Sequence, residues 1–209
     1  MRFVLASASP ARLGVLRAAG IDPVVRVSGV DEHAVTEALA DPSPAELVTE
    51  LATAKAGAVQ SMVASETPDA VVVGCDSMLS AFGEVVGKPE STEVAAQRWR
   101  RMAGGTGELL TGHAVLRLEG GRVTARAQGH LATTVRFADP SEEELDAYLA
   151  TGEPLQVAGG FTLDGYGGWF LEGVDGDPSS VIGISLPLTR RLLAEVGVRV
   201  VDLWRGSAG

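Results

Sequence analysis

The strongest constraint on the fold is a short apolar run, Ala70–Cys75, that ends in the polar pair Asp76-Ser77. Such a run is typical of a β-strand buried on both faces, with the polar pair at its carboxyl end. In open α/β sheets ligands collect beyond the carboxyl ends of strands, so Asp76 is a candidate site residue. Its carboxylate could hold a divalent cation or accept a proton from water, or it could simply cap the following turn.

Local signals place helices and strands along the rest of the chain. Ser9 and Pro10 are typical of a helix start, and that helix should end at Gly20. Mixed helices and strands with one central hairpin indicate an α/β or α+β architecture. The other expected elements are strands over Phe3–Ala6 and Pro23–Val27, helices over Pro44–Ala64 and Ser91–Met102, strands Leu109–Leu118 and Val123–Phe137 joined through Glu119-Gly120-Gly121, an acidic-headed helix from Pro140, a helix over Leu186–Val196, and a strand or extended tail over Arg199–Leu203.

Composition excludes several classes of function. The chain has 209 residues and a formal net charge of −10, which disfavours binding to nucleic-acid polymers and anionic membranes. The single cysteine, Cys75, cannot form an intramolecular disulfide, and no Cys/His cluster has zinc-ligand spacing. No run of about 18 apolar residues is present, and the amino-terminal apolar stretch is too short for a signal peptide. We therefore expect a cytoplasmic protein.

Two segments suit phosphate binding. Ser7–Arg12 combines small hydroxyl residues at a helix start with an arginine in the first turn, which is a natural anion site. In Gly87-Lys88-Pro89 a lysine lies between a flexible and a rigid residue, an arrangement that could direct its ammonium toward a phosphate. The same tripeptide is also common in ordinary turns. The alternative for the first segment is that Ser9 merely starts a helix and that Arg12 lies on its surface.

Four further positions carry ionisable side chains of ambiguous meaning. Glu32, in the pair Asp31-Glu32, and Lys55 would ordinarily face water, although the neighbours of Lys55 are mostly small or apolar. His113 and His130 fall in the expected hairpin and are better explained as strand residues than as ligands. The aromatic and glycine-rich segment 159–176 could form a base-stacking wall or complete a core.

Taken together and in this order, these motifs resemble the Maf family of nucleoside triphosphate pyrophosphatases. The similarity covers roughly residues 3 to 198. The matching pieces are Leu5–Arg12, Asp31-Glu32, Lys55-Ala56, Asp76-Ser77, Gly87-Lys88-Pro89, Thr111-Gly112, Glu153-Pro154-Leu155, Gly176–Gly183 and Leu186-Pro187-Leu188.

The resemblance implies a fold, a reaction and residue roles. The implied fold is a mixed α/β sheet with two lobes around a deep cleft, related to inosine triphosphate pyrophosphatases, in which residues 1–209 form a single domain whose lobes do not fold independently. The implied reaction is cleavage of a nucleoside triphosphate between its α- and β-phosphates with Mg²⁺ or Mn²⁺. By motif position Asp76 is the proton acceptor, and Glu32 with Asp76 holds the metal. The residues that would line the phosphate path are Ser9, Arg12, Lys55 and Lys88.

The chain departs from the family pattern in the arginines after Ser-Pro and in a stretch that bears on the preferred base. The family often has two arginines after Ser-Pro, and here Ala11 replaces the first. Members that act on dTTP and UTP typically carry a lysine and a glutamine at positions that here are Val157 and Asp164. Loss of this cation and amide leaves the catalytic assignment intact and the preferred base open.

Two other functions compete with the pyrophosphatase hypothesis. The family has been linked to septum formation, so a nucleotide-binding regulator of cell division that needs no turnover is one alternative. A sugar-nucleotide or phosphate-ester enzyme of the same architecture is another. The resemblance also makes a homodimer plausible, whereas no sequence feature predicts one directly.

Overall fold

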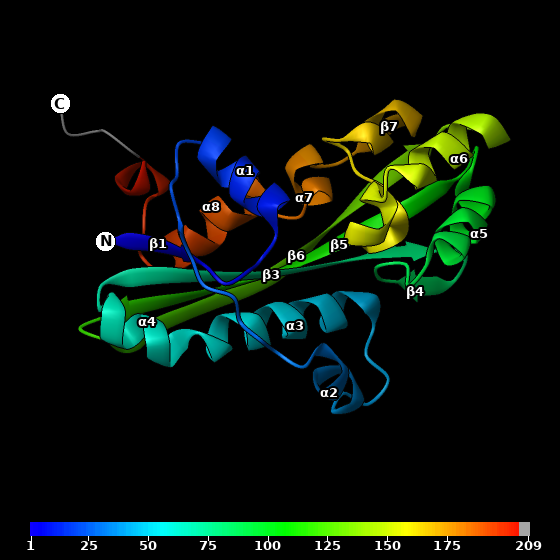
Figure 1. The fold of residues 1–209 in the computed structure, drawn as a ribbon. Helices are drawn as coiled ribbons and strands as arrows, with labels where there is room; N and C mark the ends of the chain where they lie inside the picture. The colour runs from blue at the N-terminus through cyan, green and yellow to red at the C-terminus, as the bar shows by residue number, and fades with distance from the viewer. Residues whose placement is uncertain (205–209) are drawn as a thin grey trace. The chain divides into compact units, whose positions relative to one another are not determined.

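Strands from all parts of the chain combine in one mixed sheet. The computed structural model describes residues 1–204, in which the strand order is β2-β1-β3-β5-β6-β7, with β4 paired to β3 (Figure 1). Parallel and antiparallel pairs both occur, so the predicted mixed α/β class is confirmed. The strands are β1 (Arg2–Leu5), β2 (Val24–Val25), β3 (Ala70–Ala81), β4 (Glu84–Val86), β5 (Thr106–Glu119), β6 (Arg122–Phe137) and β7 (Leu171–Asp175).

Helices connect these strands, and most of them begin where the sequence predicts. Ser9 caps the first helix, with Pro10 in its first turn, and Ser91 and Ser141 cap two others. The α-helices are α1 (Pro10–Ala18), α2 (Glu32–Glu37), α3 (Pro44–Ala58), α4 (Gln60–Glu66), α5 (Thr92–Met102), α6 (Glu142–Ala150), α7 (Pro178–Ile182) and α8 (Leu186–Glu195). Short 3-10 helices are η1 (Glu153–Gln156), η2 (Ala158–Gly160), η3 (Tyr166–Phe170) and η4 (Val200–Leu203).

The chain divides into two compact units. The first contains Met1–Asp76, Thr111–Leu131 and the chain from Gly183 onward, and the second contains Ser77–Leu110 and Ala132–Ile182. Strands β3, β5 and β6 each contribute residues to both units. The prediction of a single domain over 1–209 includes residues 205–209, which lie outside the described residues, and the predicted cleft stays a prediction.

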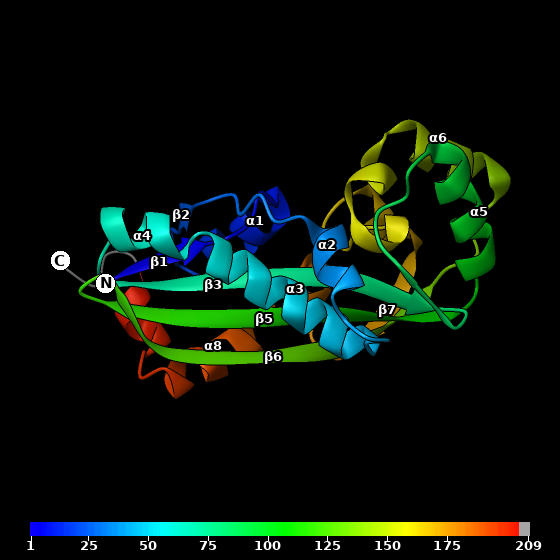
Figure 2. The same ribbon diagram turned by 90° about the horizontal axis from the view of Figure 1, so that it is seen from below.

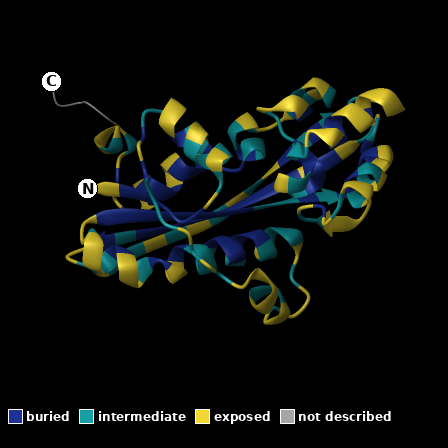
Figure 3. Cartoon of the chain, viewed as in Figure 1, coloured by how far each residue is buried: buried dark blue, intermediate teal, exposed yellow. Residues whose placement is uncertain are grey.

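In the first unit, helices cover both faces of the sheet. Alternate residues of β3 point to opposite faces: Val71 and Val73 pack with α1 and α8, whereas Ala70 and Val72 pack with α3 and α4 (Figures 1 and 2). Strand β3 is buried along most of its length, as the apolar run predicts (Figure 3). A strand covered on both faces leaves little room for polar groups, so a polar residue on it needs a specific partner.

Two glycines let α3 lie directly on the sheet (Figure 2). A Cβ atom added at Gly74 of β3 would fall 2.8 Å from the backbone nitrogen of Ala56, and one added at Gly112 of β5 would fall 2.6 Å from that of Thr49. Real Cβ atoms essentially never approach a neighbour this closely. The backbone of α3 therefore packs against strand positions that carry no side chain, and this contact sets the position of every residue on the helix.

The second unit has its own aromatic core. Trp99 of α5 is fully buried and makes edge contacts with Phe137, Tyr148 and Phe170. From the glycine-rich segment 159–176, Phe161 is buried in this core, whereas Trp169 is 85% exposed. The core-forming interpretation of the segment is thus right for Phe161 and Phe170 and wrong for Trp169.

Three sequence predictions of secondary structure are wrong. The helix expected over Pro44–Ala64 is two helices, α3 and α4, which meet at Val59. The strand expected to end at the polar pair Asp76-Ser77 continues to Ala81, because its last residues pair with β4. The segment Arg199–Leu203 forms a 3-10 turn closed by an ion pair between Arg199 and Asp202, a spacing that suits a helical turn and not a strand.

Substitution of Gly74 by alanine tests the contact between α3 and the sheet. We expect Gly74→Ala to lower the free energy of unfolding by about 1–3 kcal/mol, because rigid backbone must shift to accept the methyl group. Gly57→Ala on α3 is the control: nothing lies within 4 Å of its added Cβ, and alanine should stabilise the helix by roughly 0.5–1 kcal/mol. Urea denaturation measures both. Equal effects of the two substitutions would contradict this packing.

Candidate active site

Asp76 lies on β3 just past the end of a parallel strand pair. Strand β1 pairs with β3 in parallel from Arg2 to Leu5, and the last bond is donated by the Ala6 amide to the Val73 carbonyl. Beyond this point the chain leaves β1 for α1, so the edge of β3 at Asp76 no longer pairs with β1. Asp76 is nevertheless only 6% exposed. The carboxyl-end position is the one at which α/β sheets bind ligands, although β3 itself continues.

The Lys55 ammonium joins two carboxylates. Its Nζ lies 2.5 Å from Asp76 Oδ1 and 2.7 Å from Glu32 Oε1. The Lys55 side chain is 12% exposed, whereas the Glu32 side chain is 54% exposed, so the arrangement runs from a buried carboxylate to a solvated one. We call Glu32, Lys55 and Asp76 the carboxylate–lysine triad. The three residues are far apart in sequence, and the fold brings them together as the motif pattern suggests.

The second carboxylate oxygen of Asp76 has no partner. Among the described residues no group donates a hydrogen bond to Oδ2, which is buried. Burial raises the pKa of Asp76 above its ordinary value, and the charges of Lys55 and Arg12 only partly oppose this effect. A buried acceptor without a donor is rare in native proteins and costs stability, which marks Oδ2 as a position for a proton or a cation.

Arg12 binds backbone carbonyls of its own unit. Its Nε donates to the Gly183 carbonyl at 2.8 Å, and its Nη1 donates to the Cys75 carbonyl at 2.9 Å and to Ser7 Oγ at 3.0 Å. The guanidinium thus ties α1 to β3 next to Asp76 and to the loop that precedes α8. The alternative that Arg12 lies on the helix surface is wrong. Sequence patterns could not identify two of these partners, because they are main-chain atoms.

The other predicted site residues differ in their surroundings. Ser9 is the N-cap of α1, and its hydroxyl accepts from the Arg12 amide at 3.3 Å. Lys88 belongs to the second unit, where it follows β4 and is exposed. Substrate contacts of Ser9, Arg12, Lys55 and Lys88 stay predictions.

Two other chemically active side chains are occupied or inert. His113 is buried, and its Nε2 accepts a hydrogen bond from the Ser185 amide at 2.8 Å, so it is a structural strand residue as expected. Burial raises the pKa of the Cys75 thiol to about 11, which keeps it protonated at neutral pH.

No helix within residues 1–204 is long and apolar enough to cross a membrane.

The fold and site define an α/β protein with a buried carboxylate–lysine centre beyond the end of a parallel strand pair. Residues 2–196 match the family model described as Maf-like protein. The chain belongs to the Maf family.

Close relatives span nearly the whole chain. A protein of Saccharopolyspora erythraea is 76% identical over 98% of this chain and 97% of its own length. Proteins of Nocardia farcinica and Rhodococcus jostii are 66% and 62% identical and cover 99% and 98% of this chain, which spans 98% and 97% of their lengths. Each of the three is named nucleoside triphosphate pyrophosphatase.

A solved structure from Mycobacterium abscessus, described as a nucleoside-triphosphatase or dITP/XTP pyrophosphatase, is 15% identical to this chain, and the match covers 75% of this chain and 96% of that one. Its TM-score of 0.32 is too low to establish a shared fold.

Removal of the Lys55 ammonium should leave Asp76 as an uncompensated buried charge. We expect Lys55→Met to lower the free energy of unfolding by about 3 kcal/mol near neutral pH. The folded-state pKa of Asp76 is raised, so folded protein retains a proton that the unfolded chain has released, and stability falls as pH rises through that window. Without Lys55 the pKa of folded Asp76 rises further above that of the unfolded chain, so stability falls over a wider range of pH. The loss of stability in Lys55→Met should therefore be smaller at about pH 5 than at about pH 8. Urea denaturation at both pH values measures the difference.

The double variant Lys55→Met/Asp76→Asn is the control for this loss. It removes both charges, so it should recover most of the stability and should not show the pH dependence of the single variant. A single variant as stable as the unaltered protein at both pH values would contradict the coupling.

Substitution of Arg12 tests its role in linking α1 to β3. We expect Arg12→Lys to lower the free energy of unfolding by about 1–3 kcal/mol, because one ammonium cannot reproduce three hydrogen bonds in different directions. Arg17→Lys, on the same helix, is the control, since the Arg17 side chain is 56% exposed and pairs with solvated Asp22. Thermal and urea denaturation give both values. Equal stability of the two variants would remove the structural role of Arg12.

Proposed function

We propose that this protein hydrolyses a nucleoside triphosphate to its monophosphate and pyrophosphate, with Asp76 as the proton acceptor. The observation that carries the proposal is the unpartnered, buried Oδ2 of Asp76, whose other oxygen is fixed by Lys55. The names of the three close relatives support the same activity. An acceptor that is held in place and lacks a donor is suited to take a proton from a bound water.

The reaction is a displacement at the α-phosphorus. The water oxygen forms a bond to this phosphorus, the bridging bond between the α- and β-phosphates breaks, and the water proton passes to Asp76 Oδ2. Pyrophosphate leaves with the electrons of the broken bond. Burial raises the pKa of Asp76, which makes its carboxylate a stronger base than that of an exposed aspartate.

The charges of the site suit a phosphate chain. A triphosphate brings about four negative charges, and phosphoryl transfer depends on positioning and on cations that stabilise the leaving oxygens. We assign Lys55 and Lys88 to direct phosphate contact. The amino end of α1, capped by Ser9 and held by Arg12, adds backbone amides that favour an anion. A protein of net charge −10 can bind this substrate because the cations are local.

A divalent cation fits the triad only together with the substrate. Residues 1–204 contain no group of three or more His, Cys, Asp or Glu side chains placed to hold a metal ion. Mg²⁺, however, is commonly bound by one or two carboxylates together with substrate phosphates, and Glu32 with Asp76 provides such a pair. Bound there, Mg²⁺ or Mn²⁺ would neutralise phosphate charge and polarise the phosphoryl oxygens.

A nucleotide-binding regulator of cell division, which needs no turnover, is the alternative. It would use the same cations but would not require an acceptor at Asp76 Oδ2. A cytoplasmic location, a homodimer and the lack of a nucleic-acid or membrane partner stay predictions, as does the preferred base, for which Val157 and Asp164 depart from the dTTP- and UTP-type pattern.

Substitution of Asp76 separates the two functions. With a panel of standard and modified nucleoside triphosphates and Mg²⁺ or Mn²⁺, we expect pyrophosphate release that Asp76→Asn lowers by about 10³-fold or more, because the amide cannot accept the proton. Nucleotide binding, measured by calorimetry, should persist. Asp202→Asn, which alters an exposed ion pair, is the control and should leave the rate unchanged.

Each possible outcome of this assay has a distinct meaning. Binding of several triphosphates without cleavage of any would favour the regulator. Orthophosphate in place of pyrophosphate would indicate a different phosphohydrolase. Full activity in the presence of a chelator would exclude the divalent cation, and full activity of Asp76→Asn would exclude Asp76 as the proton acceptor.

A further inference from the structure

The carbonyl of Gly87, directly before Lys88, accepts two hydrogen bonds from different parts of the second unit. Arg98 Nη1 donates to it at 2.8 Å and the Gly159 amide at 3.2 Å. Arg98 lies on α5, and Gly159 lies in η2. A loop carbonyl with two such donors is fixed in direction, and the peptide plane that it shares with the Lys88 nitrogen is fixed with it.

We propose that Arg98 is a positioning residue that sets the direction of Lys88 through the Gly87 carbonyl. The proposal rests on the proposed function, in which Lys88 contacts the phosphate chain. Lys88 is exposed, so a ligand can reach it. Gly87 by itself does not fix the backbone that leads into Lys88, because it has open space around its Cα and many accessible conformations.

The residues on either side of Lys88 are held by the same neighbours. Strand β4 ends at Val86, which pairs with Leu79 of β3. On the other side Pro89 is buried, and its ring lies 3.2 Å from a Cβ added at Gly160. The Gly160 carbonyl accepts from Trp99 Nε1 at 2.7 Å. Consecutive residues of α5, Arg98 and Trp99, thus bind the Lys88 segment and the 3-10 turn against which it packs.

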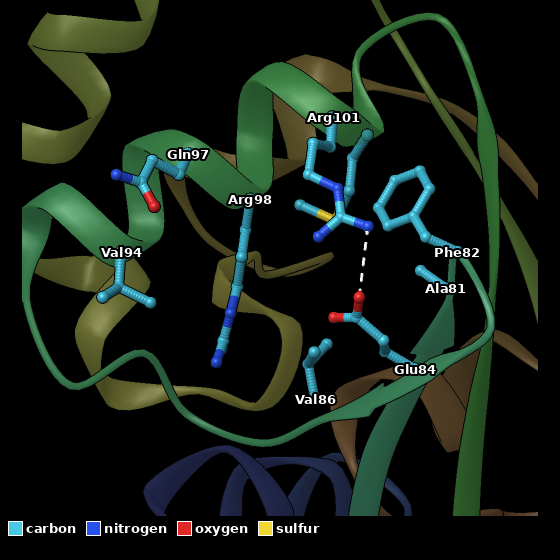
Figure 4. A pocket seen from close by; sticks show the side chains of 9 residues that line it. Ala81, Phe82, Glu84, Val86, Val94, Gln97, Arg98 and Arg101 are labelled. Atoms are coloured by element: carbon cyan, nitrogen blue, oxygen red, sulfur yellow. Dashed lines mark hydrogen bonds and ion pairs between the residues drawn. The ribbon is translucent and has the colours of Figure 1, made fainter.

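Arg98 crosses a cavity to reach Gly87. The cavity has a volume of about 190 Å³ and lies between α5 and the β3–β4 hairpin (Figure 4). Figure 4 shows the Arg98 side chain extended across it from the helix. Arg101, one turn further along, lines the same cavity but turns to Glu84 at 3.4 Å and stacks over Phe82 at 4.5 Å from the ring centroid. The two arginines share a helix and a cavity, and only Arg98 holds Gly87.

The expected cost of losing Arg98 follows from positioning. A cation that stabilises charge in the transition state loses most of its effect when it is displaced by about 1 Å, which can lower a rate by about 10²-fold. The Gly159 amide alone would still hold Gly87, so we expect Arg98→Ala to lower kcat by about 10- to 100-fold with a smaller change in KM. Arg98→Lys, which retains a donor, should recover part of the rate.

A double-substitution cycle tests whether Arg98 acts through Lys88. Pyrophosphate release is measured for Arg98→Ala, Lys88→Ala and both together, with Arg101→Ala as the matched control. If Arg98 acts only by orienting Lys88, Arg98→Ala should lower the rate of the Lys88→Ala variant by less than about threefold. Arg101→Ala should leave the rate within about twofold of that of the unaltered protein. Additive losses in the double variant would overturn the proposal.

Hydrogen exchange gives a readout that needs no activity. Because the Gly159 amide donates to the Gly87 carbonyl, Arg98→Ala should speed exchange at Gly159 by about tenfold or more, and Arg101→Ala should not. Unchanged exchange in Arg98→Ala, with thermal stability retained, would overturn the proposal. Failure of the unaltered protein to release pyrophosphate would instead refute the proposed function. The exchange experiment would still test whether Arg98 holds the Gly87 carbonyl.

Discussion

The first unit depends on the close approach of α3 to the sheet. Gly74 and Gly112 carry no Cβ, and the helix backbone at Ala56 and Thr49 occupies the space that side chains would need. Side chains ordinarily fill the space between a helix and the sheet that it covers. Here the gap is closed, so Lys55, one residue before Ala56, reaches Asp76 on the strand that also carries Gly74. Two positions without side chains therefore place the ammonium of the triad.

The triad in turn allows a strand buried on both faces to carry a charge. An isolated buried carboxylate would be strongly destabilising, and Lys55 offsets that cost for Oδ1. Oδ2 remains uncompensated, and burial keeps the pKa of Asp76 raised. The same residual cost that lowers stability makes this oxygen reactive toward a proton or a cation. Stability and chemistry oppose each other at this atom, as they often do at functional sites.

In each unit an arginine side chain fixes main-chain carbonyls by hydrogen bonds. Arg12 donates to the carbonyls of Cys75 and Gly183, and Arg98 donates to the carbonyl of Gly87. In both places the guanidinium lies next to a segment that carries a proposed functional residue, Asp76 or Lys88. A planar group with five donors can fix several acceptors at once, which an ammonium cannot. Lysine supplies the cations assigned to the substrate, and arginine holds the segments around them.

Local sequence signals predicted most helix starts and the central hairpin. Capping serines, Pro10 in its helix and the Gly120-Gly121 turn act within a few residues, so the helix starts and the hairpin follow from short patterns. The ordered motifs also identified the residues of the triad. The folded structure was needed to show that Lys55 faces Asp76, that β3 continues past Asp76, and that Arg12 binds main-chain carbonyls. These outcomes depend on contacts between distant segments and on main-chain acceptors, which every residue has and no side-chain pattern distinguishes.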